Sequence, residues 1–387
     1  MKSVEGLPTV YLFVSRKNEA ALCAEFNQII AKSLDTFVPQ EINRFSSIFQ
    51  YLMELAVNRQ FNLVIDEFQE FYNINESVYS DMQNIWDMYR KRTKMNLIVS
   101  GSVKEPLFGR ADNIIKLSAF NLDTLKEIMY DHNPDFSNDD LLALYTFTGG
   151  VPKYVELFCD NNITTIKKMI TFMVSDNSPF TDEGKYLLIE EFGKSYATYF
   201  SILGAISGGI NTQPKIEAAL GSISIGGQIK RLIEDYNIVV RQRPLMQNEG
   251  THTVRYEIQD NFIRFWFNYF ERYRSLIEIK NFDGLRSIIT SNYTTYSGIM
   301  LERYFKQKLA ESKQFRAIGS WWEHKGTQNE IDIVALKLEK NRALAIEVKR
   351  KKNNFKPELF AAKVNHLKKK ILPKYQVEML CLTLEDM

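Results

Sequence analysis

Three ionisable residues near the C-terminus have the types and spacing of a metal-dependent hydrolytic site. Asp332 lies in the apolar segment NEIDIVAL, and Glu347 and Lys349 lie in the apolar segment ALAIEVK. Alternate residues of a strand point to one face, so Glu347 and Lys349 should lie side by side, with Asp332 on the neighbouring strand. Two carboxylates can bind Mg²⁺ or Mn²⁺, and the ammonium can activate water or stabilise a charged phosphate transition state. Glu302, on the preceding helix, could complete the site.

An ordinary ion pair on a sheet face is the alternative interpretation of Glu347 and Lys349. A bare E-x-K pattern favours that alternative. Asp332, Glu302 and the basic run 350–352 that follows Lys349 favour a nuclease-like fold, and they leave a cleaving site and a structural ion pair equally open.

A second group of polar residues follows two other apolar segments. The segment LVID ends in Asp66 and Glu67, and the segment LIVS ends in Ser100. At the carboxyl end of a parallel strand, an Asp can hold a nucleotide's Mg²⁺ and the next Glu can polarise the attacking water. Ser100 could sense a γ-phosphate, and Arg110 could act on a phosphate, although for Arg110 by itself a surface ion pair is the favoured explanation.

A third signal is the element order of residues 195–260. Three helical segments precede two short strands, which is the order of a winged helix-turn-helix. The expected recognition helix, 226–236, carries Lys230 and Arg231, and the expected wing carries Arg241, Arg243 and Arg255. These side chains could contact phosphates and a major groove. Because acidic residues share the recognition helix, a packing or protein-contact module is the alternative.

The segments that carry these residues predict an α/β protein. Buried strands are expected at 9–15, 61–66, 96–101 and 113–118, and they alternate with helical segments. This alternation predicts a parallel sheet with helices on both faces. Residues 121–192 should be helical, and a helix, three strands, a helix and a strand should follow from about residue 293. The expected domains are 1–120, 121–192, 193–290 and 291–387.

Composition restricts the class of protein and its partners. The 387 residues are 45% hydrophobic and 25% charged, which is typical of a globular chain and excludes a disordered one. We expect a cytoplasmic protein that does not bind membranes, because no long apolar run, signal peptide or cysteine framework is present. The net charge is +2, yet residues 337–375 hold 13 Lys and Arg against 3 Asp and Glu. This basic region suggests a polyanionic partner such as nucleic acid, although composition alone favours a solvated lysine-rich helix; a homo-oligomer is compatible with the sequence.

Several of these motifs together resemble a known family. The segments LVIDEFQ, LIVSGS, LFGR and GGVPKY occur in the order found in archaeal-type ATPases of the AAA-related, STAND-like branch. The resemblance implies an ATPase core, a helical lid and a winged helix. It implies bound ATP and Mg²⁺ at Asp66, with Gly150 and Pro152 starting a helix near the nucleotide. The segment YEIQDNFIRFWFNYF resembles the link into the domain of unknown function that follows such ATPases, and the D…E-x-K pattern resembles PD-(D/E)XK nucleases.

One departure from that family concerns the phosphate-binding loop. The motif G-x-x-x-x-G-K-[ST] does not occur in the 387 residues, and the first strand corresponds to the family's second. We favour a start assigned at an internal methionine over loss of the nucleotide site. The expected function is that of an ATPase-family protein acting on nucleic acid, with a Mg²⁺-dependent nuclease domain and little ATP hydrolysis by this chain. The alternatives are a non-enzymatic DNA-binding regulator and a nucleotide-gated interaction protein.

Overall fold

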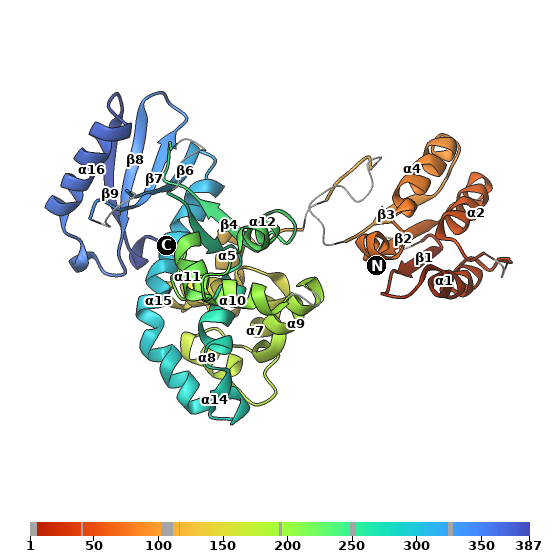
Figure 1. Cartoon of the computed structure of the whole chain (residues 1–387), viewed down its shortest axis with the longest axis horizontal. Helices are drawn as coiled ribbons and strands as arrows, with labels where there is room; N and C mark the ends of the chain where they lie inside the picture. The colour runs from red at the N-terminus through yellow and green to blue at the C-terminus, as the bar shows by residue number, and fades with distance from the viewer. Residues whose placement is uncertain are drawn as a thin grey trace. The chain divides into compact units, whose positions relative to one another are not determined.

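The chain divides into two compact units. The computed structural model describes residues 6–39, 42–101, 111–115, 117–192, 196–247, 253–323 and 328–387. The first unit is Met1–Lys116 and the second is Leu117–Met387 (Figure 1). In the described part of the chain, no helix is both long and apolar enough to cross a bilayer.

The first unit is built on a three-stranded parallel sheet in the order β1-β2-β3. Its elements are β1 (Thr9–Phe13), α1 (Glu19–Leu34), α2 (Phe45–Asn58), β2 (Asn62–Asp66), the 3₁₀ helix η2 (Phe68–Glu70), α3 (Phe71–Ile74), α4 (Ser77–Tyr89) and β3 (Asn96–Val99). Asn18 begins α1 because its side chain accepts a hydrogen bond from the Ala21 amide. Val10, Leu12 and Leu63 pack in one core with the helices.

Two expectations for this unit are wrong. The sequence predicts helices on both faces of the sheet, but the described helices pack against one face. Alternate residues on the other face are exposed, among them Phe13, at 49%, and Ile98. The fourth strand is not formed by the described residues of 113–118. Ile115 and Leu117 in that segment are exposed, and an apolar run becomes a strand only where a neighbouring strand accepts its hydrogen bonds.

The second unit begins with the expected helical region. Its helices are α5 (Leu122–His132), α6 (Asn138–Thr148), α7 (Pro152–Asp160), α8 (Ile166–Met173) and α9 (Phe180–Phe192). A capping box of Ser137 and Asp140 starts α6, and Gly149 in the left-handed region ends it. Gly150 has a φ of +77°, and a Cβ there would lie 2.8 Å from the Phe120 carbonyl oxygen. Both the positive φ and the close approach to Phe120 require glycine at position 150, in the turn before α7.

The next segment has the expected three helices and two strands. They are α10 (Tyr196–Ser207), α11 (Gln213–Ala219), α12 (Gly226–Glu234), β4 (Val239–Gln242) and β5 (Arg255–Ile258). The two strands pair antiparallel, with Val239 opposite Ile258. We call them the β4–β5 hairpin.

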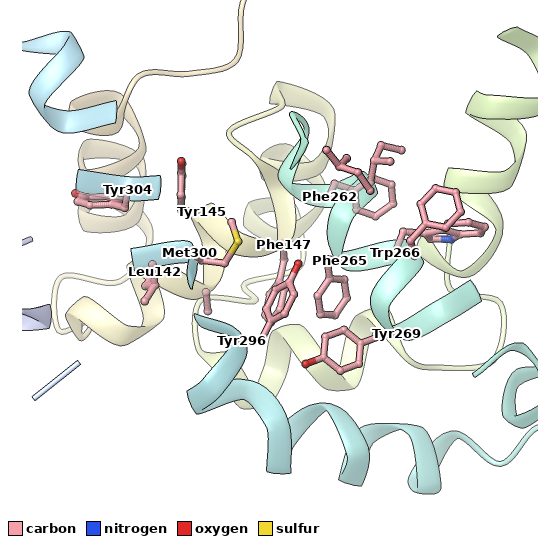
Figure 2. Packing of buried hydrophobic residues seen from close by; sticks show 14 of the residues in the cluster. Leu142, Tyr145, Phe147, Phe262, Phe265, Trp266, Tyr269, Tyr296, Met300 and Tyr304 are labelled. Atoms are coloured by element: carbon pink, nitrogen blue, oxygen red, sulfur yellow. The ribbon is translucent and has the colours of Figure 1, made fainter. Parts of the chain in front are cut away.

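An aromatic core joins the helical region to the following helices, α13 (Asn261–Phe265), the π-helix η4 (Trp266–Glu271), α14 (Arg274–Glu278) and α15 (Phe282–Glu311). Figure 2 shows Phe147 of α6 beside Phe265 and Tyr296. The Phe147 and Phe265 rings lie 4.8 Å apart, edge to face. The segment 262–270 is buried apart from its half-buried Asn268, as are Trp321 and Trp322, so reading these aromatics as core is confirmed.

The C-terminal part has the expected order of elements. After α15 come β6 (Phe315–Trp321), β7 (Ile331–Lys337), β8 (Arg342–Val348), the 3₁₀ helix η5 (Lys352–Asn354), α16 (Pro357–Ile371), β9 (Gln376–Leu382) and the 3₁₀ helix η6 (Leu384–Asp386). The sheet order is β6-β7-β8-β9, with β9 parallel to β8 and the other pairs antiparallel. The expected divisions at 192 and 290 lie inside the second unit, and α15 runs without interruption through 290.

Candidate active site in the C-terminal sheet

The structure brings Asp332, Glu347 and Lys349 together at one end of the C-terminal sheet. Asp332 lies on β7 and Glu347 on β8, next to the paired residues Ile333 and Ile346. The Asp332 carboxylate accepts a hydrogen bond of 2.8 Å from the Val348 amide. This bond fixes the Asp332 side chain across the two strands, as the strand periodicity predicted.

Two ammonium groups flank the Glu347 carboxylate. The Nζ of Lys349 lies 3.0 Å from Glu347 Oε1 and 3.8 Å from Asp332 Oδ2. The Nζ of Lys363, from α16, lies 3.4 Å from both carboxylate oxygens of Glu347. Glu347 is only 8% exposed, so this carboxylate is buried and doubly paired.

Glu302 belongs to the same electrostatic cluster. It lies on α15, which packs against β7 and β8. Burial, and after it the negative charge of Asp332, raise the pKa of Glu302 to about 8. Burial and the charge of Glu347 also raise the pKa of Asp332, against the lowering effect of the Val348 amide. At neutral pH, therefore, Glu302 is mostly protonated.

Lys349 remains charged in this environment. Burial lowers its pKa, but the hydrogen bond to Glu347 and the charge of Asp332 outweigh burial and leave the pKa raised. A permanently charged ammonium beside two carboxylates can stabilise a developing negative charge; it cannot take a proton from water.

The donor atoms at this site suit a hard divalent cation, because they are carboxylate oxygens. Within the described ranges, no three His, Cys, Asp or Glu side chains are already arranged around one point to hold a metal ion. Glu347 is engaged by Lys349 and Lys363. A cation that binds Glu347 would thus displace at least one ammonium from it.

The DNA-binding residues expected in the segment 193–290 differ in how free their charged groups are. Lys230 lies 3.6 Å from Glu234, and Arg231 hydrogen-bonds Tyr199, while Arg241 is exposed on β4. Arg255 is engaged instead with Glu330. Arg243 is half-buried, and its Nε has no hydrogen-bond partner among the residues that the structure describes.

In the first unit, Asp66 and Ser100 come together at the carboxyl ends of β2 and β3. Ser100 Oγ donates to Asp66 at 2.5 Å, and Tyr11 Oη donates to the other carboxylate oxygen at 2.5 Å. These two hydrogen bonds hold the pKa of Asp66 below its ordinary value. Glu67 adopts a left-handed φ of +54°, a strained position for a residue with a side chain. Arg110 lies outside the described residues, and Gly150 and Pro152 belong to the second unit.

Sequence reasoning missed three participants. Lys363 is one of many lysines on a basic helix, and only the docking of α16 selects it. Tyr11 reads as an ordinary strand residue, although its alternation with buried Val10 and Leu12 indicates the open face of the sheet. Glu330, which directly precedes β7, carries no sequence signal that distinguishes it from other surface acids.

Comparison with known proteins identifies relatives for most of the chain. The family profile DUF234, described as archaeal and bacterial proteins of unknown function, matches residues 266–361. A Walker-type ATPase of Pyrococcus abyssi superposes with a TM-score of 0.45 and 14% identity over 67% of this chain and 84% of that one. The uncharacterised protein MJECL04 of Methanocaldococcus jannaschii is 33% identical over 311 residues, which cover 74% of this chain and 67% of the relative. The chain therefore belongs to the same family as this Methanocaldococcus protein.

Proposed function

We propose that the C-terminal sheet hydrolyses phosphodiester bonds in nucleic acid with the help of a divalent cation. The observation that carries the proposal is the position of Lys349, whose Nζ lies 3.0 Å from Glu347 and 3.8 Å from Asp332 at the ends of two paired strands. The basic composition of residues 337–375 supports a polyanionic substrate.

Each residue has a distinct part in this proposal. Asp332 and Glu347 would hold Mg²⁺ or Mn²⁺, with Glu302 as a third ligand once it has lost its proton. A metal held there would lower the pKa of a bound water and neutralise phosphate charge. Lys349 would stay protonated and stabilise the extra negative charge on the phosphoryl oxygens while the water oxygen bonds to phosphorus and the leaving oxygen departs. The water would lose its proton to solvent, and the leaving oxygen would take a proton from a solvent water. Lys363 shares the Glu347 carboxylate with Lys349 and helps to hold it in place.

The winged-helix segment is the proposed second contact with nucleic acid. Lys230, Arg231, Arg241 and Arg243 would bind phosphates with little sequence preference. The exposed position of Arg241 and the order of elements support this role. Charge reversal at Arg231 and Arg241 should weaken binding to duplex DNA, and unchanged affinity would favour a packing module instead.

The first unit is proposed to be a partial nucleotide site. The carboxylate of Asp66, held by Ser100 and Tyr11, suits Mg²⁺, but the sequence contains no G-x-x-x-x-G-K-[ST] loop to bind phosphates. Titration of the chain with labelled Mg-ATP should detect negligible binding. A dissociation constant in the micromolar range would contradict this and favour the nucleotide-gated alternative.

The decisive experiment for the nuclease proposal combines Mn²⁺ calorimetry with plasmid nicking. The whole chain is used, because a fragment that begins at 291 would cut through α15. Wild type should bind Mn²⁺ and nick supercoiled plasmid. Lys349→Ala should keep Mn²⁺ binding and slow nicking, whereas Lys280→Ala, which removes a lysine paired with Asp176 outside the basic region 337–375, should change neither.

A wild-type chain that neither binds Mn²⁺ nor nicks plasmid would overturn the nuclease proposal. Salt-dependent DNA binding by that inactive chain would then favour a non-enzymatic DNA-binding regulator.

A further inference from the structure

The β4–β5 hairpin is attached to the scaffold of the carboxylate cluster at both ends of β5. At the start of β5, Arg255 Nη1 lies 2.5 Å from Glu330 Oε1. At its end, Arg303 of α15 donates a 2.9 Å hydrogen bond to the Ile258 carbonyl and a second one to the Gln259 carbonyl. Arg303 directly follows Glu302 in the chain.

The Arg255 guanidinium is held on two sides. Its two terminal nitrogens both donate to the Glu330 carboxylate, at 2.5 and 3.4 Å. Its central carbon lies 4.4 Å from the centroid of the Trp322 ring, which is buried. A planar guanidinium that is both paired with a carboxylate and stacked on a ring loses most of its freedom to contact another anion. Arg255 is therefore poorly placed for the DNA contact expected from the sequence.

Glu330 connects this contact to the cluster. It directly precedes β7 and lies two residues before Asp332. Its charge acts on Glu302, together with that of Asp332. A further contact holds the hairpin in place: the Leu245 amide donates to the Ser320 carbonyl, and the Ser320 hydroxyl donates to the Asp332 carbonyl.

We propose that Arg255 is a positioning residue of the candidate site, which acts through Glu330 to hold the start of β7, and with it Asp332, in register with β8. This inference rests on the proposed function of Asp332 and Glu347. Without Arg255, Glu330 would be an unpaired carboxylate beside Asp332 and Glu302, and repulsion would turn it outwards. The first residues of β7, which include Asp332, would become more mobile. The hydrogen bond from the Val348 amide to the Asp332 carboxylate would then open more often.

Hydrogen exchange of the Val348 amide in the whole chain tests this directly, because that amide is bonded to Asp332. Arg255→Ala should raise its exchange rate about tenfold, the value expected when one hydrogen bond to a charged group is weakened. Arg255→Lys should restore part of the protection. Glu330→Gln should raise exchange as Arg255→Ala does, and the double variant should add nothing further. The matched control is Arg342→Ala, which removes an arginine paired with Glu378 at the other end of β8.

Two results would overturn the inference. One is exchange at Val348 that does not respond to Glu330→Gln, because Arg255 would then act only through its ring contact. The other is an equal response to Arg342→Ala, because the effect would then be a general loosening of the sheet.

Plasmid nicking adds a second, separate readout. A positioning role lowers kcat and leaves KM for plasmid unchanged, whereas a DNA contact through Arg255 raises KM and leaves kcat unchanged. If wild type nicks no plasmid, the proposed function fails, and the exchange data still decide whether Arg255 positions Asp332.

Discussion

Replacing Asp332 in two ways separates its proposed catalytic role from its structural one. The Asp332 carboxylate accepts the Val348 amide at 2.8 Å and lies 3.8 Å from the Lys349 ammonium. Alanine removes both interactions, whereas asparagine keeps an acceptor for the amide and removes only the charge. Both variants should abolish metal-dependent nicking, because neither supplies a carboxylate ligand.

The two variants should differ in stability. Asp332→Ala leaves a partly buried amide without its partner, which costs about 2 kcal/mol. For a unit of this size, that loss corresponds to a decrease in Tm of about 4 °C. Asp332→Asn loses the attraction of Lys349 but also the repulsion from Glu347 and Glu302, so its stability should lie within about 1 kcal/mol of wild type.

Thermal melts followed by circular dichroism, together with plasmid nicking in Mn²⁺, measure both effects. Equal destabilisation by the two substitutions would show that the Val348 hydrogen bond is not what holds this region. Nicking by Asp332→Asn at the wild-type rate would refute the role of Asp332 as a metal ligand, whatever the melts show.

Three further predictions concern pH, packing and salt. The folded-state pKa of Glu302 is raised to about 8, so its contribution to stability is fully present below the ordinary pKa of a glutamate and is lost as the pH rises towards 8. In urea titrations, the free energy of unfolding of Glu302→Gln minus that of wild type should therefore increase from pH 5 to pH 8. A difference that stays constant over this range would contradict the raised pKa. Gly184→Ala should destabilise the protein by about 1–3 kcal/mol, because the new Cβ would lie 2.3 Å from the Trp266 ring. In the same melts, Gly204→Ala, on a helix with open space, should be neutral or stabilising. Duplex DNA binding through segment 349–370 should weaken with salt at a log–log slope of about −4 to −5, and a salt-independent affinity would exclude phosphate contacts.

The sequence by itself determined the local elements and the faces of the strands. The C-terminal order of helix, three strands, helix and strand could be predicted because each segment has its own hydrophobic period. The same period of two placed Glu347 and Lys349 on one face. The proximity of Asp66 and Ser100 could also be predicted, because parallel strands align their carboxyl ends at one edge of the sheet.

Tertiary structure decided which distant side chains join these sites. Nothing in the sequence distinguishes Lys363 from the other lysines of α16, and only the docking of that helix on the sheet brings its ammonium to Glu347. The pairing of Arg255 with Glu330 spans 75 residues and depends on how the β4–β5 hairpin packs against β6. The segment 113–118 has the composition of a strand, yet its described residues pair with no neighbour. Periodicity reports which face of an element is apolar, whereas the partner of that face is fixed by packing between segments far apart in the chain.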